Sequence, residues 1–157
     1  MESMSAYNLA TKLMSKHGLD IAGWRFEFDR AKRRFGCCKY RTKRITLSLS
    51  LTELNSEKEV KDTILHEIAH ALVGRKHGHD YVWRSKALEI GCNGNRCYSK
   101  EVNTPQSKYI AICVGCETNY KRHRVPKNGR SHSCKKCSGG RYNENFKLDW
   151  KENVTIQ

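Results

Sequence analysis

Apolar residues recur at every fourth position between residues 56 and 73, which predicts an amphipathic helix. Ser56 is placed to cap its amino end, and Glu59 three residues later completes a capping box. Gly74 is placed to end it, because glycine readily adopts the backbone conformation that follows a helix. We expect one stripe of this helix to face a core, and the stripe consists of Val60, Ile64, Ile68 and Leu72.

Alternating apolar and polar residues predict strands ahead of this helix. Residues 24–28 alternate aromatic and charged side chains, and residues 44–48 alternate in a similar way, so we expect a small antiparallel sheet. A narrow apolar face between Ser5 and His17 predicts an N-terminal helix. These elements indicate an α+β fold in which the sheet packs against the helix at 56–73.

A polar segment divides the chain into two parts. Residues 99–107 are polar, contain a proline and are typical of a linker. We therefore expect one domain at residues 1–98 and a small module at residues 108–157. At 157 residues the chain has room for one modest core plus a small module that a metal holds together.

The helix at 56–73 carries the sequence HEIAH at residues 66–70. His66 and His70 lie on one face of such a helix, one turn apart, where both imidazoles can bind a single zinc ion. Glu67 is then placed to take a proton from a zinc-bound water, as a catalytic base. This is the signature of a zinc-dependent peptide-bond hydrolase. A chance match in a surface helix is disfavoured, because the motif lies inside a well-capped helix.

A catalytic zinc needs a third protein ligand, and His77, His79 and Glu89 are the candidates. His77 comes one residue too late for the metzincin motif HExxHxxGxxH. Glu89 has roughly the spacing of the glutamate ligand in thermolysin-like enzymes. His79 stands just ahead of Asp80, which is placed to cap a second helix that runs to Ile90, and a ligand at a helix start is rigidly positioned. We favour His79 and keep the other two as alternatives.

Two CxxC pairs near the C-terminus predict a β zinc ribbon, because four thiolates close a tetrahedral structural zinc site. With the catalytic site, this gives two zinc ions per chain. Two disulfides would need an oxidising compartment, which nothing in the sequence indicates. The ribbon ligands are Cys113, Cys116, Cys134 and Cys137. The other cysteines are predicted to be small, buried apolar side chains, and they are Cys37, Cys38, Cys92 and Cys97.

Several segments resemble the SprT and Spartan metalloproteases. GRKHGHDYVW at residues 74–83 is similar to the HGxxF/W element that follows HExxH in that family, with Tyr81 and Val82 in place of its usual Pro-Glu. The resemblance implies that the third ligand lies four residues before Trp83, at His79. FGCCKYRTKRITLSLSL at residues 35–51 is similar to the family's hairpin, and several members carry a C-terminal ribbon. The resemblance also implies DNA repair through cleavage of proteins attached to or crosslinked on DNA.

Positive charge points to nucleic acid as a partner. The chain has 30 Lys and Arg against 16 Asp and Glu, a formal charge of +14. Residues 107–143 hold nine Lys or Arg and one Glu, which gives +8, or about +6 once four thiolates and a zinc ion are counted. That density attracts phosphate backbones and exceeds what solubility needs. The expected contacts are Lys121, Arg122, Arg124, Lys127, Arg130, Lys135, Lys136 and Arg141.

No base-reading helix is recognisable, so we expect binding to single-stranded or duplex DNA without sequence preference. Tyr120 and Tyr142 lie among these charges and are placed to stack on unpaired bases. A second basic cluster, the alternative DNA site, consists of Lys32, Arg33, Arg34, Lys39, Arg41, Lys43 and Arg44.

The sequence therefore predicts a DNA-associated zinc metalloendopeptidase. One alternative is a nucleic-acid-binding protein with a weak or regulatory protease site, although a binding-only site has no need of Glu67 as a base. The other is a general metallopeptidase that does not depend on DNA. No stretch approaches the roughly 20 apolar residues of a membrane span, and the N-terminus has no apolar signal core. We expect a cytoplasmic, nucleoid-associated protein of a bacterium or a phage-infected cell.

Overall fold

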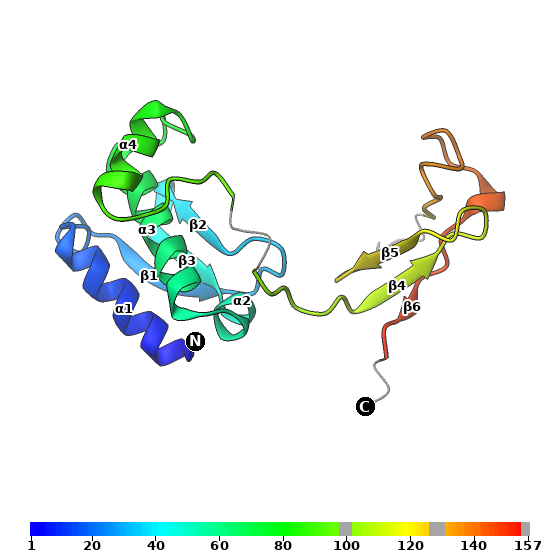
Figure 1. Ribbon diagram of the computed structural model, residues 1–157, viewed down its shortest axis with the longest axis horizontal. Helices are drawn as coiled ribbons and strands as arrows, with labels where there is room; N and C mark the ends of the chain where they lie inside the picture. Colours follow the sequence, from blue (N-terminus) through cyan, green and yellow to red (C-terminus); the bar gives the residue numbers. More distant parts are fainter. Residues whose placement is uncertain (98–101, 126–130, 155–157) are drawn as a thin grey trace. The chain divides into compact units, whose positions relative to one another are not determined.

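The computed structural model describes residues 1–97, 102–125 and 131–154. The chain divides into two compact units, Met1–Pro105 and Gln106–Gln157, which Figure 1 shows. This boundary falls inside the predicted linker, of which residues 99–101 lie outside the described residues. Each unit is described by itself.

The first unit is built on a sheet of β1 (Arg25–Asp29), β2 (Gly36–Lys39) and β3 (Arg44–Ser48). The strand order is β1-β3-β2, with β3 parallel to β1 and antiparallel to β2. The α+β class is confirmed, but the sheet is mixed, so the prediction of a purely antiparallel sheet was wrong. The reason lies in β3, where four consecutive residues are buried. A strand with so many buried residues is favoured in the centre of a sheet, and β3 lies between β1 and β2.

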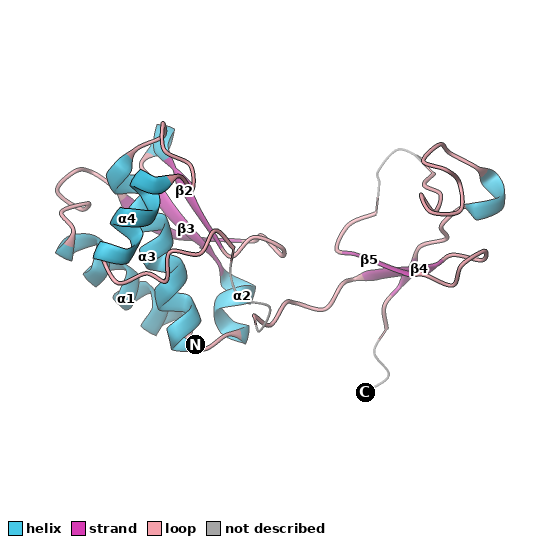
Figure 2. Ribbon diagram, turned by 45° about the horizontal axis from the view of Figure 1, so that its top comes forward, coloured by secondary structure: helices cyan, strands magenta, loops and turns pink. Residues whose placement is uncertain are grey.

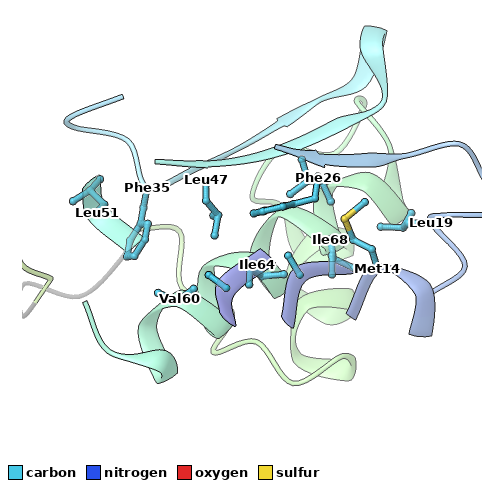
Figure 3. Packing of buried hydrophobic residues seen from close by; sticks show 12 residues of the cluster. Met14, Leu19, Phe26, Phe35, Leu47, Leu51, Val60, Ile64 and Ile68 are labelled. Atoms are coloured by element: carbon cyan, nitrogen blue, oxygen red, sulfur yellow. The ribbon is translucent and has the colours of Figure 1, made fainter. Parts of the chain in front are cut away.

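Helices cover one face of this sheet, as Figure 2 shows. α1 (Ser3–Lys16) packs on β1, and α3 (Glu57–Val73) packs on α1, β2 and β3. Figure 3 shows the core between these layers, in which Phe26 and Leu47 from the sheet meet Ile64 and Ile68 from α3. A short helix, α2 (Leu49–Leu54), follows β3, and a 3₁₀ turn, η1 (Tyr40–Thr42), joins β2 to β3. Sequence reasoning missed both.

The predicted boundaries of α3 are confirmed. The Ser56 hydroxyl accepts a hydrogen bond from the Glu59 backbone N–H, and the Glu59 carboxylate accepts one from the Ser56 N–H. Gly74 ends the helix with a φ of 84°. The predicted stripe is buried at its first three positions, but Leu72 in the last turn is 36% exposed, which corrects that part of the prediction.

A second face of α3 packs on α4 (Tyr81–Glu89). Leu65 and Ala69 from α3 are buried there against Trp83 and Ala87 from α4. The Asp80 carboxylate caps α4 by accepting from the Trp83 N–H at 3.0 Å, as predicted. α3 is thus held on two sides, and its HEIAH segment lies in this buried part of the helix.

The second unit is a small sheet of β4 (Tyr109–Ile112), β5 (Asn119–Arg122) and β6 (Lys151–Glu152), in the order β5-β4-β6, with a 3₁₀ turn η2 (Glu144–Phe146). Among the residues of this unit that the structure describes, four form the buried core, and these are Ala111, Cys113, Cys134 and Leu148. Two of the four are cysteines, so this unit has little apolar packing of its own. Within the described part of the chain, no helix is long and apolar enough to cross a bilayer.

Candidate metal centres and catalytic cavity

Three histidines from two elements of the first unit converge on one point. α3 supplies His66 and His70, and the loop before α4 supplies His79. Their Nε2 atoms lie 3.2 Å (His66 to His70), 3.1 Å (His70 to His79) and 2.9 Å (His66 to His79) apart. The structure thus brings together the three residues that the sequence favoured as ligands.

This triangle fits a tetrahedral zinc ion. With Zn–N bonds of about 2.0–2.1 Å, tetrahedral ligand atoms lie roughly 3.3–3.4 Å apart. Burial lowers the pKa of both His66 and His70 to about 4, so both rings are neutral near pH 7 and have a free lone pair. His66 also donates to the backbone carbonyl of Asn95, a bond of the kind that fixes the ring orientation of a metal ligand.

The indole of Trp83 supports all three imidazoles. Its ring centre lies 4.6 Å from those of His66 and His79 and 5.2 Å from that of His70, and the side chain is 1% exposed. Trp83, on the buried face of α4, therefore holds the three imidazoles in place. The sequence identified Trp83 only as a marker for counting back to His79, and gave no sign of this packing role.

Glu67 is buried beside this triangle, with 7% of its surface exposed. Burial raises the pKa of its carboxyl group to about 7, while the Arg34 charge and the Cys38 backbone N–H oppose the shift. A Cβ atom at Gly36 would lie 2.6 Å from Glu67 Oε1, so β2 can approach the carboxylate only because this position is glycine. Sequence reasoning did not find the contributions of Gly36 and Cys38.

A cavity of about 710 Å³ opens over these groups. Its wall includes the three histidines and Glu67, the strand β2, the loop before α4, and residues 95–97. The volume lies in the range typical of ligand-binding pockets. β2 is an edge strand of the sheet, so one side of its backbone has no strand partner within the described part of the unit.

The side chains of the two alternative ligands have other partners. His77 Nδ1 is 2.9 Å from the Asp80 carboxylate, and Glu89 forms an ion pair with Lys86 on the surface of α4. Among the described residues, the group that can hold a metal in this unit contains His79 and neither alternative.

The second unit brings its four predicted cysteines together. Cys113 and Cys137 Sγ lie 3.8 Å apart, and Cys116 and Cys134 Sγ lie 3.6 Å apart. Zn–S bonds of about 2.3 Å give tetrahedral sulfur separations of roughly 3.8 Å, so this group also fits a zinc ion. The Tyr120 hydroxyl is 2.9 Å from Cys134 Sγ. Tyr120 is therefore part of the ribbon interior rather than a free stacking surface.

The remaining cysteines occupy different environments. Cys92 is 4% exposed and packs in the core beside Trp83, as predicted. Cys97 is exposed, and Cys37 and Cys38 are partly exposed on the cavity wall, so the prediction of four buried thiols holds for one of them. Cys37 and Cys38 are accessible because β2 is an edge strand.

The predicted DNA contacts are mostly at the surface of the second unit. Arg122 stacks over the Trp150 ring at 4.7 Å and is partly buried. Lys127 and Arg130 lie outside the described residues. The exposed members are Lys121, Arg124, Lys135, Lys136 and Arg141.

Comparison with known proteins matches residues 4–106 to the SprT-like family. Proteins named Protein SprT are similar, with 25% identity over 104 residues in Pseudomonas putida (strain GB-1) and 27% over 114 residues in Glaesserella parasuis serovar 5 (strain SH0165). These matches cover 59% and 67% of this chain, and 63% and 73% of the two relatives. The family match spans the unit that holds the histidines and Glu67. The chain therefore belongs to the SprT-like family.

Proposed function

We propose that this chain is a zinc-dependent metalloendopeptidase that cleaves proteins bound or crosslinked to DNA. The observation that carries the proposal is the buried Glu67 carboxylate beside three converging histidine Nε2 atoms at the base of an open cavity. Family membership and the basic four-cysteine unit support it.

His66, His70 and His79 would hold the catalytic zinc, and the four ribbon cysteines would hold a structural one. When bound, zinc polarises the scissile carbonyl and lowers the pKa of a water to about 7. Glu67 takes the proton of the attacking water and passes it to the leaving amine, acting as base and then as acid. Burial raises the pKa of this carboxyl group, which makes it a better proton acceptor than an exposed carboxylate.

An extended peptide suits this cavity. The free edge of β2 lies on the cavity wall beside Glu67, and an added strand forms backbone hydrogen bonds irrespective of its sequence. Such recognition fits a protease whose targets share their attachment to DNA rather than a sequence motif. The exposed Lys and Arg of the second unit would supply the attachment to DNA by contacting phosphates.

Glu67→Gln tests the chemistry. The amide has the same shape but accepts no proton, so we expect bound zinc and the fold to be retained while cleavage falls by roughly 10²–10⁴-fold. The measurements are metal content by mass spectrometry and cleavage of a DNA-bound protein. Near-normal cleavage by this variant would show that Glu67 is not the base.

The same assay tests the role of DNA. The wild-type protein should cleave a DNA-bound protein faster than the same protein free in solution. Equal cleavage rates for the two substrates, with no effect of added DNA, would indicate a general metallopeptidase instead.

A further inference from the structure

The register of the first sheet places three cations side by side on one face. Arg25 on β1 pairs with Arg44 on β3, and Arg44 pairs with Lys39 on β2. Residues paired across neighbouring strands point to the same side of a sheet. Phe26, Ile45 and Cys38 form the next paired row, and Phe26 and Ile45 are buried against the helices. The cation row therefore lies on the opposite face from α1 and α3.

This row is electrostatically unfavourable in the free protein. Like charges directly opposite on neighbouring strands destabilise a sheet. Glu27 offsets one of them, through an ion pair with Arg44 at 3.0 Å. In the described part of the chain, no carboxylate lies within ion-pair distance of Arg25 or Lys39, and both side chains are exposed.

The neighbouring η1 turn extends the row. Arg41 is exposed there, and the Lys43 ammonium donates to the Ala22 carbonyl. Tyr40 in the same turn lines the catalytic cavity. Tyr40 lies between Lys39 and Arg41 in the chain, so the row adjoins the cavity wall at this residue.

We propose that this cation row, defined as Arg25, Lys39 and Arg44 with the adjacent Arg41, is a nucleic-acid backbone site within the first unit, separate from the ribbon. A linear series of positive charges matches the regular negative charges of a phosphate backbone, which relieves the repulsion in the row. The choice of nucleic acid as the polyanion rests on the proposed function. The site would hold the strand beside the cavity, so that proteins attached nearby reach Glu67.

The test is binding of a fluorescent oligothymidine strand by the full chain, titrated against salt. It is run in the Glu67→Gln background so that the result is independent of proteolysis. The variant is Arg25→Thr with Lys39→Thr, since threonine suits strands and the Arg44–Glu27 pair stays intact. The control removes the same charge from exposed helix positions on α1, with Lys12→Gln and Lys16→Gln.

The strand variant should bind more weakly than the control, and its salt slope should flatten by roughly 0.7 for each phosphate that it no longer neutralises. Its thermal midpoint should stay the same or rise, because the repulsion is gone. Combining it with charge reversal of Lys121, Arg122 and Arg124 should weaken binding further than either change alone.

Three outcomes would overturn the site. The strand variant could bind DNA like the control. Its weaker binding could come with a lower thermal midpoint, which indicates damage to the sheet. The strand variant could keep full DNA affinity but lose binding to anionic phosphatidylserine vesicles that the control still binds. That result would assign the row to a lipid surface.

Discussion

At the scale of single residues, the choice of the third ligand depends on which way two nearby histidines point. His79 Nε2 faces the other two imidazoles, whereas His77 Nδ1 faces Asp80. Both residues lie on the cavity wall, so their place in the cavity does not show which one is the ligand. Geometry does, because only a converging nitrogen can complete a tetrahedral site.

His79→Ala should therefore lower zinc occupancy of the first unit, and His77→Ala should leave it near that of the wild type. Metal content per chain, measured with the ribbon site intact as an internal reference, checks both variants. Loss of metal on changing His77, with retention on changing His79, would reverse the assignment. Because the His77–Asp80 pair lies at the surface, His77→Ala should change stability only slightly.

At the scale of elements, the close approach of β2 to α3 positions the Glu67 carboxylate. Gly36 stands where a Cβ atom would overlap Glu67 Oε1 at 2.6 Å and Cγ at 2.8 Å. The Cys38 N–H two residues on hydrogen-bonds the same side chain. The strand thus restrains the Glu67 side chain from one side, while the helix presents it from the other.

Gly36→Ala should displace the Glu67 side chain and lower cleavage toward the level expected for Glu67→Gln, with zinc content unchanged. Gly36 has no left-handed backbone conformation, so the effect is steric rather than conformational. The matched control is Gly78→Ala in the same cavity wall, where a Cβ atom meets nothing within 4 Å. The measurements are the peptide-cleavage rate and the metal content of both variants. Equal cleavage rates for Gly36→Ala and Gly78→Ala would contradict this role for Gly36.

At the scale of the whole molecule, the two units differ in what holds them together. The first has an apolar core formed by its sheet and helices. In the described part of the second, the core consists of four buried residues, and two of these are candidate metal ligands. A unit with so little apolar packing rarely folds alone, so we propose that a metal ion at the four cysteines stabilises it.

Removing metal with a strong chelator should therefore unfold the second unit and leave the first folded. Limited proteolysis should then cut within residues 106–157 and spare a fragment close to Met1–Pro105. Cys134→Ser should produce the same pattern without chelator, and His70→Ala should not. A protease-resistant second unit after complete metal removal would contradict this prediction.

The sequence by itself determined what depends on neighbours along the chain. The capping box at Ser56, the end of α3 at Gly74 and the one-turn spacing of His66 and His70 follow from helix geometry. The two cysteine pairs follow from the short reach of a CxxC turn. These local relations hold whatever the rest of the chain does, which is why they could be predicted.

Only the tertiary structure decided what depends on partners distant in sequence. The placement of β3 between β1 and β2 made the sheet mixed, and it set Arg25, Arg44 and Lys39 in one row. The same placement left β2 at the edge beside Glu67. Strand order and register arise from burial of side chains across the whole unit, and no local pattern in the sequence records them.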